Sequence, residues 1–142
     1  MTTLVWKYPY LASDSQANAD NGNITFSNKS KKIFKIGRKF FSGAGTWDCI
    51  GLFVHSYKKN KRYTHKILDM ETLVLEIGKK NILVHTSSGI QTYDKKGFYA
   101  WGSGRSSALA ALYMGASAEQ AVEIACKVDN FSGGKVTSVR IG

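Results

Sequence analysis

Residues 102–134 read GSGRSSALAALYMGASAEQAVEIACKVDNFSGG, and this stretch contains two apolar helical patterns in succession. The first predicts a helix over 105–113, ended by Gly115, because glycine readily takes the left-handed conformation that follows a helix. The second predicts a helix over 117–129 with Ser117 as its N-cap. Two consecutive helices bounded by strands indicate a fold in which helices cover a sheet rather than alternate with strands.

Most of the remaining chain predicts short strands. One more helix is expected, opened by the glycine-rich turn at 43–45 and running to about Lys59. Helices grouped between blocks of antiparallel strands are typical of a layered α+β domain, and 142 residues suit a single domain over 1–142. The expected strands cover 2–6, 10–14, 24–26, 33–36, 39–43, 72–78, 81–87, 90–93, 98–102 and 135–141.

The chain is strongly basic, with a formal net charge of +10. Two runs, 29–39 and 57–66, carry most of the excess. Such a charge permits binding to nucleic acid or to an acidic partner. On charge alone we favour a solvated basic face, because the aromatic residues near these runs alternate like core residues of a strand rather than forming a stacking platform for bases.

The cysteines and histidines do not indicate a metal site. Cys49 and Cys126 stand alone, without a CxxC motif, and the three histidines are far apart in the sequence. We expect buried, reduced thiols. The sequence shows no secretory signal and no apolar segment of membrane length. We therefore expect a cytoplasmic protein that is not in the membrane.

Two short motifs flank the predicted helix pair. Gly-Ser-Gly at 102–104 lies at a strand-to-helix junction, where free backbone N–H groups can hold an anion or a tetrahedral oxygen. Asp129 lies at the C-terminal end of the second helix, followed by Ser132. A carboxylate at the negative end of a helix dipole is unfavourable, so we expect other groups to hold Asp129.

Six segments complete a pattern that runs through nearly the whole chain. In order, they read MTTLVW (1–6), LASDSQ (11–16), NKSKKIFKI (28–36), FFSGAGTWDC (40–49), YAWGSG (99–104) and DNFSGG (129–134). Their order and spacing resemble the proteasome β-subunit family of N-terminal nucleophile (Ntn) hydrolases, which includes the HslV-like peptidases. The resemblance implies a four-layer αββα sandwich of two antiparallel sheets between helical layers.

The resemblance also implies a threonine protease whose nucleophile is Thr2, freed by removal of Met1. A threonine hydroxyl needs a base beside it, and an N-terminal amine has a suitable reference pKa of about 7.7–8.0. A nearby lysine, Lys32, would lower that pKa and stabilise developing negative charge, while Asp14 would keep the lysine charged and oriented. The supporting residues around the amine would be Ser103, Asp129 and Ser132.

Strand alternation selects the lysine. In KKIFKI (31–36), alternation places Lys32 with Phe34 on one face and Lys31 with Ile33 on the other. Counted from the nucleophile, Lys32 also falls at the position of the family's lysine.

The same alignment assigns substrate contacts. The oxyanion donor would be a backbone N–H of the turn that contains Ala44, where the family usually has glycine, and Gly45. Asn18 stands where proteasome subunits have a threonine that pairs with the substrate backbone. The side-chain pocket would be lined by Ser30, Phe34, Ser42 and Thr46.

No cofactor is expected. A structural monovalent cation would bind the backbone carbonyls of Cys126, Asp129 and Ser132, as in HslV-like proteins. The resemblance further implies a homo-oligomeric ring that cleaves polypeptides, fed by an ATP-dependent unfoldase. A catalytically silent scaffold or partner-binding protein of the same fold, with the basic surface facing an acidic partner, is the second hypothesis. Binding to nucleic acid ranks third.

Overall fold

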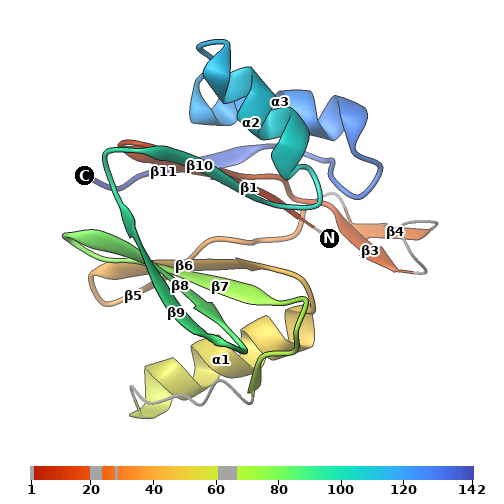
Figure 1. Cartoon of the computed structure of the whole chain (residues 1–142). Coiled ribbons are helices and arrows are strands. Elements are labelled where there is room, and N and C mark those ends of the chain that lie inside the picture. Colours follow the sequence, from red (N-terminus) through yellow and green to blue (C-terminus); the bar gives the residue numbers. More distant parts are fainter. Residues whose placement is uncertain (1, 20–23, 28, 61–66) are drawn as a thin grey trace. The chain divides into compact units, whose positions relative to one another are not determined.

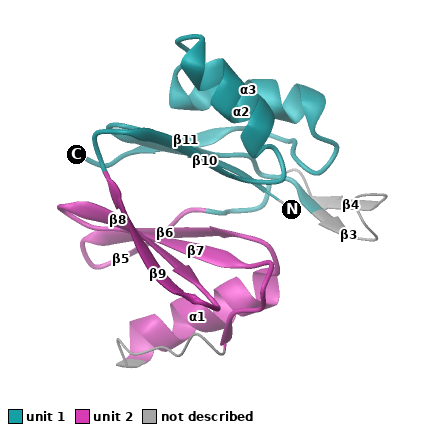
Figure 2. Cartoon of the chain, in the orientation of Figure 1, with its two compact units in different colours: residues 1–32, 95–142 teal, residues 33–94 magenta. Residues whose placement is uncertain are grey.

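The structure is a computed structural model that describes residues 2–19, 24–27, 29–60 and 67–142. Contacts divide the chain into two compact units, one of residues 1–32 and 95–142 and the other of residues 33–94 (Figure 2). Each unit contains an antiparallel sheet and at least one helix. This content confirms the predicted α+β class, while the expectation of a single domain stays a prediction.

The first unit is built on a four-stranded sheet with the order β10-β1-β2-β11 (Figure 1). The strands are β1 (Thr3–Lys7), β2 (Tyr10–Ser13), β10 (Phe98–Gly102) and β11 (Thr137–Arg140). The helices α2 (Arg105–Tyr113) and α3 (Ala118–Val128) lie together on one face of this sheet. Both helices match the predicted ones, and Ser117 caps α3 in a capping box with Gln120.

Small residues join the helices of the first unit to its sheet. Val5 of β1 and Ala12 of β2 are fully buried against α2 and α3. The helices meet them with Ala108, Leu112, Ala118, Ala121, Val122 and Ala125. Because alanine side chains are short, the helices lie close to the sheet, which brings residues after the end of α3 near the ends of β1 and β2.

A short ribbon follows β2. It pairs β3 (Ala17–Ala19) with β4 (Ile24–Ser27) in antiparallel register. The sequence predicted the second of these strands and not the first, because a three-residue strand within a polar segment has no apolar alternation to mark it.

The second unit is a five-stranded sheet with the order β5-β6-β7-β8-β9. Its strands are β5 (Phe34–Ile36), β6 (Lys39–Ala44), β7 (Leu73–Ile77), β8 (Asn81–Thr86) and β9 (Gly89–Asp94). The helix α1 (Trp47–Asn60) contributes Ile50 and Phe53 to a core that includes Phe41 and Val74 of the sheet. The basic segment after α1 lies largely outside the described residues.

The junction between β6 and α1 differs from the prediction. The strand continues through Gly43 to Ala44, and the helix begins only at Trp47. At Gly43 a Cβ atom would lie 2.8 Å from the Leu73 carbonyl oxygen and 2.9 Å from two atoms of the Ile50 side chain. This glycine therefore permits close contact between strand and helix rather than opening the helix.

Within the described ranges, we find no helix that is both long enough and apolar enough to cross a membrane.

Candidate active site

The strand register of the first unit brings several predicted site residues together. Thr3 pairs with Gly102, and Leu4 pairs with Ser13. Thr2 therefore lies just before β1, while Asp14 follows the end of β2 and Ser103 follows the end of β10. These three residues meet at one end of the sheet. The Ser103 N–H donates to the Thr2 carbonyl, and Asp14 hydrogen-bonds to the backbone of Thr3.

Asp14 and Lys32 form a buried ion pair. Lys32 Nζ lies 2.9 Å from Asp14 Oδ1, and their side chains are 1% and 0% exposed. Asp14 also accepts backbone hydrogen bonds from Thr3 (3.1 Å), Gln16 (3.4 Å) and Gly133 (3.1 Å). Burial lowers the pKa of Lys32 from its ordinary value, although the Asp14 carboxylate partly offsets this effect.

The two adjacent lysines differ as alternation predicted, since Lys31 is exposed and Lys32 is buried. Ile33 does not follow the pattern, because it is 8% exposed rather than directed outward with Lys31. The reason is local, since β5 begins only at Phe34 and the residues before it are not in a strand.

Asp129 is held by the donors that its unfavourable helix position requires. It is the C-cap residue of α3. Its Oδ2 atom accepts hydrogen bonds from Ser103 Oγ at 2.5 Å and from Ser132 Oγ at 2.7 Å. Its Oδ1 atom accepts one from the Phe131 backbone N–H at 3.3 Å. The structure thus brings Ser103, Asp129 and Ser132 into one cluster.

Thr2 is held by its backbone. Its side chain is buried, and its carbonyl oxygen accepts a hydrogen bond from the Ser103 backbone N–H at 2.9 Å. Within the described residues, its Oγ1 atom has no hydrogen-bond partner. The buried lysine is therefore bonded through Asp14 to the neighbour of Thr2, and not directly to the Thr2 hydroxyl.

Thr3 is a site residue that the sequence did not reveal. Its backbone N–H donates to Asp14 Oδ1, and its Oγ1 atom lies 2.6 Å from Ser132 Oγ. Strand alternation separates the side chains of consecutive threonines onto opposite faces. Alternation alone does not show that the Thr3 side chain belongs to the same site as Thr2. No other feature of the sequence shows it either.

The predicted substrate residues fall in different parts of the chain. Ser30 and Asn18 belong to the first unit: the Ser30 N–H donates to the Ser15 carbonyl at 2.8 Å, and Asn18 lies in β3. The second unit contains the others, namely Phe34, Ser42, Ala44, Gly45 and Thr46. Their role in substrate binding stays a prediction.

The turn that contains Ala44 and Gly45 is tightly held within the second unit. Gly45 has φ of +114°, and a Cβ there would lie 2.6 Å from the Glu71 carbonyl oxygen. The Thr46 N–H donates to Thr72 Oγ1 at 2.9 Å, and Thr46 Oγ1 donates to Asp69 Oδ2 at 2.6 Å. These contacts fix the backbone that would supply an oxyanion donor.

Cys126 lies on α3, where its thiol interacts electrostatically with Asp14 and Lys32. Burial and the nearby carboxylates raise the pKa of its thiol to about 11, so the thiol stays protonated at neutral pH. The Asp129 carbonyl, a predicted cation ligand, already accepts a hydrogen bond from the Ser132 N–H at 3.3 Å. The cation site stays a prediction. Among the described residues, no group of three His, Cys, Asp or Glu side chains could hold a metal.

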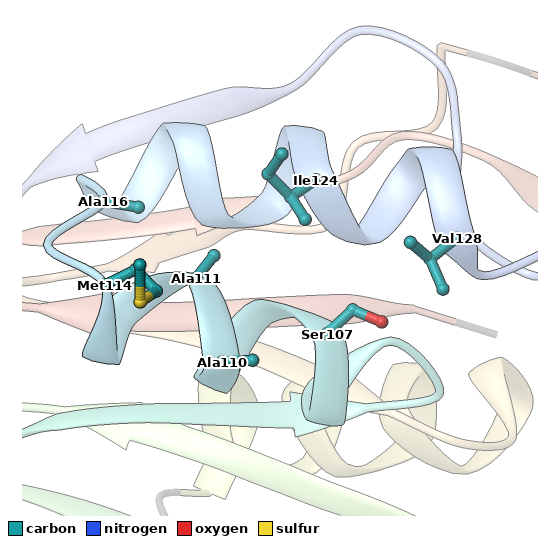
Figure 3. Close-up of a pocket in the computed structure, with 7 residues that line it drawn as sticks. All are labelled: Ser107, Ala110, Ala111, Met114, Ala116, Ile124 and Val128. Carbon is teal, nitrogen blue, oxygen red and sulfur yellow. The ribbon is translucent and has the colours of Figure 1, made fainter.

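An apolar pocket lies between α2 and α3 (Figure 3). None of the predicted site residues lines it. Its lining consists of Ser107, Ala110, Ala111, Met114, Ala116, Ile124 and Val128.

The fold is shared with known structures. Two solved structures of Thiobacillus denitrificans BPH, a bacterial proteasome homologue, resemble this chain, one of them in complex with epoxomicin. The complex gives a TM-score of 0.67 at 18% identity, and the other structure gives 0.65 at 20% identity. Each comparison covers 99% of this chain and 98% of the other. No protein-family model and no curated protein sequence matches. At this identity the likeness shows a proteasome-like fold and no activity.

Proposed function

We propose that this chain is a threonine-type endopeptidase subunit, in which Thr2 becomes the nucleophile after Met1 is removed. One observation carries the proposal. The buried Asp14–Lys32 pair and the Asp129 hydroxyl cluster both hydrogen-bond to the segment formed by Thr2 and Thr3. A buried carboxylate and a buried lysine beside a small hydroxyl residue are costly to fold, and with the half-buried Asp129 they are groups that acyl transfer can use.

The chemistry follows from these groups. Once Met1 is removed, the Thr2 α-amine accepts the proton of the Thr2 hydroxyl. The reference pKa of an N-terminal amine is about 7.7–8.0, so part of it is neutral near physiological pH. The Oγ1 atom attacks the substrate carbonyl, and the tetrahedral intermediate collapses to an ester as the α-ammonium protonates the leaving amine. Water, activated by the same amine, then hydrolyses the ester. The positive charge of Lys32 favours a neutral amine and stabilises the intermediate.

Finer features belong to the same proposal. They include the four-layer αββα arrangement, a backbone N–H of the Ala44–Gly45 turn as oxyanion donor, and a cytoplasmic, homo-oligomeric ring that degrades polypeptides delivered by an ATP-dependent unfoldase. The proteasome-like fold of the solved neighbours supports a ring, since BPH is itself named as a proteasome homologue.

The test starts with the intact mass of the purified protein. We expect a mass without methionine, and then a covalent adduct at Thr2 after treatment with a peptide vinyl sulfone, located by peptide mapping. Epoxomicin, which binds the Thiobacillus BPH, is the second probe. Cleavage of fluorogenic peptides should disappear in Thr2→Ala, while the midpoint of urea unfolding should stay unchanged.

A different result supports the silent scaffold. If Met1 is retained, or if processed protein is neither labelled nor active, the peptidase proposal fails. The basic surface would then be examined with an acidic polypeptide and with a nucleic acid, whose binding should weaken steeply with added salt.

A further inference from the structure

The peptide group between Thr2 and Thr3 is fixed at both ends. The Thr2 carbonyl accepts a hydrogen bond from the Ser103 backbone N–H at 2.9 Å. The Thr3 N–H donates to Asp14 Oδ1 at 3.1 Å. Since this peptide joins the proposed nucleophile to β1, its two hydrogen bonds restrict the orientation in which Thr2 leaves the sheet.

The Thr3 side chain is part of a directed chain of hydroxyl groups. Ser132 Oγ has one proton, and it donates that proton to the Asp129 carboxylate at 2.7 Å, because an ionised carboxylate can only accept. In the 2.6 Å contact between Thr3 and Ser132, the Thr3 hydroxyl must therefore be the donor. The proton order is Thr3 to Ser132 to Asp129.

The surrounding atoms leave the Thr3 hydroxyl little freedom. Thr3 is completely buried. A Cβ atom at Gly104 would lie 2.1 Å from Thr3 Oγ1 and 2.9 Å from the Ala125 methyl group. The hydroxyl thus occupies the space that any side chain at 104 would fill. Glycine at 104 leaves this space open, and there the hydroxyl lies 2.6 Å from Ser132 Oγ.

We propose that Thr3 is a positioning residue of the site: its hydroxyl orients Ser132 and, through it, Asp129, while its N–H couples Thr2 to the Asp14–Lys32 pair. This inference rests on the proposed function. Thr3 does not attack substrate, since its hydroxyl is already committed to Ser132 and its nitrogen lies within the chain. It acts on the reaction only through the groups that it holds.

The test compares Thr3→Val, which keeps the shape and removes the hydroxyl, with Thr3→Ser, which keeps the hydroxyl. Both are made in protein shown by mass to lack Met1. We expect Thr3→Val to lower kcat for a fluorogenic peptide about tenfold or more, with KM little changed, and Thr3→Ser to retain most of kcat.

A double-mutant cycle tests whether Thr3 acts through Ser132. In a Ser132→Ala background, the additional effect of Thr3→Val on kcat should largely vanish. If Thr3→Val does not fold, Thr3→Ala takes its place in the same measurements. Wild-type kcat and KM in the hydroxyl-free variant would overturn the inference while the peptidase proposal stands. A processed wild-type protein that neither cleaves peptides nor is labelled at Thr2 would overturn both.

Discussion

The Nζ atom of Lys32 lies 2.9 Å from Oδ1 of Asp14, and both side chains are withdrawn from water. Each charge compensates the other for its lost hydration. Removing one partner of such a pair leaves a buried, uncompensated charge, which typically destabilises a protein by about 3–5 kcal/mol. The pair is therefore a stability element of the first unit as well as a candidate catalytic element, and the two roles can be separated.

We expect Lys32→Met to lower the free energy of unfolding by about 3 kcal/mol, at the lower end of that range because Asp14 keeps its backbone donors. The neighbouring Lys31 is exposed, so Lys31→Met should change stability by less than about 0.5 kcal/mol. Urea denaturation measures both values. If Lys31→Met proved the more damaging substitution, the placement of Lys32 in the site would be wrong.

The pH dependence of activity gives a second prediction for this pair. Because burial lowers the pKa of Lys32, its ammonium should lose its proton below the ordinary value of 10.5, and activity should fall on the alkaline side. Asp14 opposes this shift, so Asp14→Asn should move the alkaline limb of kcat/KM to still lower pH. A profile whose alkaline limb is the same in both proteins would show that Lys32 does not need its charge for the reaction.

Sequence patterns predicted the helices that carry this site better than they predicted the contacts between its residues. The helix pair over 105–113 and 117–129 could be predicted because periodicity, a capping residue and a following glycine agree. The need for donors at Asp129 could also be predicted, because a carboxylate at a helix C-terminus is unfavourable wherever it occurs. Both conclusions depend only on local chemistry.

The rest depends on strand pairing, which no local pattern determines. Alternation places Thr2 and Thr3 on opposite faces, but only the register of β1 with β2 and β10 shows that Asp14 and Ser103 bracket their shared peptide. The role of Gly43 likewise requires the position of Ile50 and Leu73, which come from α1 and β7. The predicted orientation of Ile33 was wrong because alternation was applied to residues that precede the strand.

Two glycines form a matched pair for testing the crowding around Thr3. A methyl group at Gly104 would meet the Thr3 hydroxyl and the Ala125 methyl, whereas one at Gly51, on the exposed side of α1, would meet nothing within 4 Å. Gly51→Ala should therefore stabilise the protein by about 0.5–1 kcal/mol, the usual helical preference for alanine. Gly104→Ala should destabilise it by about 1–3 kcal/mol through overpacking and should lower kcat. Equal midpoints for the two variants in urea denaturation would contradict the close contact at Thr3.

The second unit contains a buried carboxylate, Glu76, whose effect on stability appears at acid pH. Glu76 Oε1 lies 2.9 Å from His85 Nε2, and Glu76 Oε2 accepts a hydrogen bond from Lys39 Nζ at 2.7 Å. Burial alone would raise the pKa of Glu76, but the bonds to His85 and Lys39 outweigh burial and lower it below its ordinary value of 4.5. A carboxyl group with a lowered pKa in the folded state stabilises the protein above its unfolded pKa, and this contribution is lost as the pH falls through the folded value.

We therefore expect Glu76→Gln to reduce the acid sensitivity of the protein. The free energy of unfolding of the wild type should fall between about pH 5.5 and about pH 3.5, and in the variant this fall should be smaller. Urea denaturation at the two pH values gives the difference, with Glu119→Gln on the exposed face of α3 as the control that should leave the fall unchanged. An identical pH dependence in the wild type and Glu76→Gln would mean that the pKa of Glu76 is not lowered.

The turn before α1 offers a test of the proposed oxyanion donor that does not touch Thr2. Gly45 and Gly37 both have positive φ, at +114° and +62°, but a methyl group at Gly45 would lie 2.6 Å from backbone atoms of Glu71 and Thr72, and one at Gly37 would meet nothing within 4 Å. Gly37→Ala should lower the free energy of unfolding by about 1–2 kcal/mol, the cost of the left-handed conformation. Gly45→Ala adds the clash and should lower the free energy of unfolding further.

Because the turn must shift to relieve that clash, Gly45→Ala should also reduce kcat about a hundredfold, the usual effect of losing one oxyanion donor. Gly37→Ala should keep wild-type kcat. Measurement of kcat at a temperature where both variants are folded decides the point, and unchanged kcat in Gly45→Ala would place the oxyanion donor elsewhere.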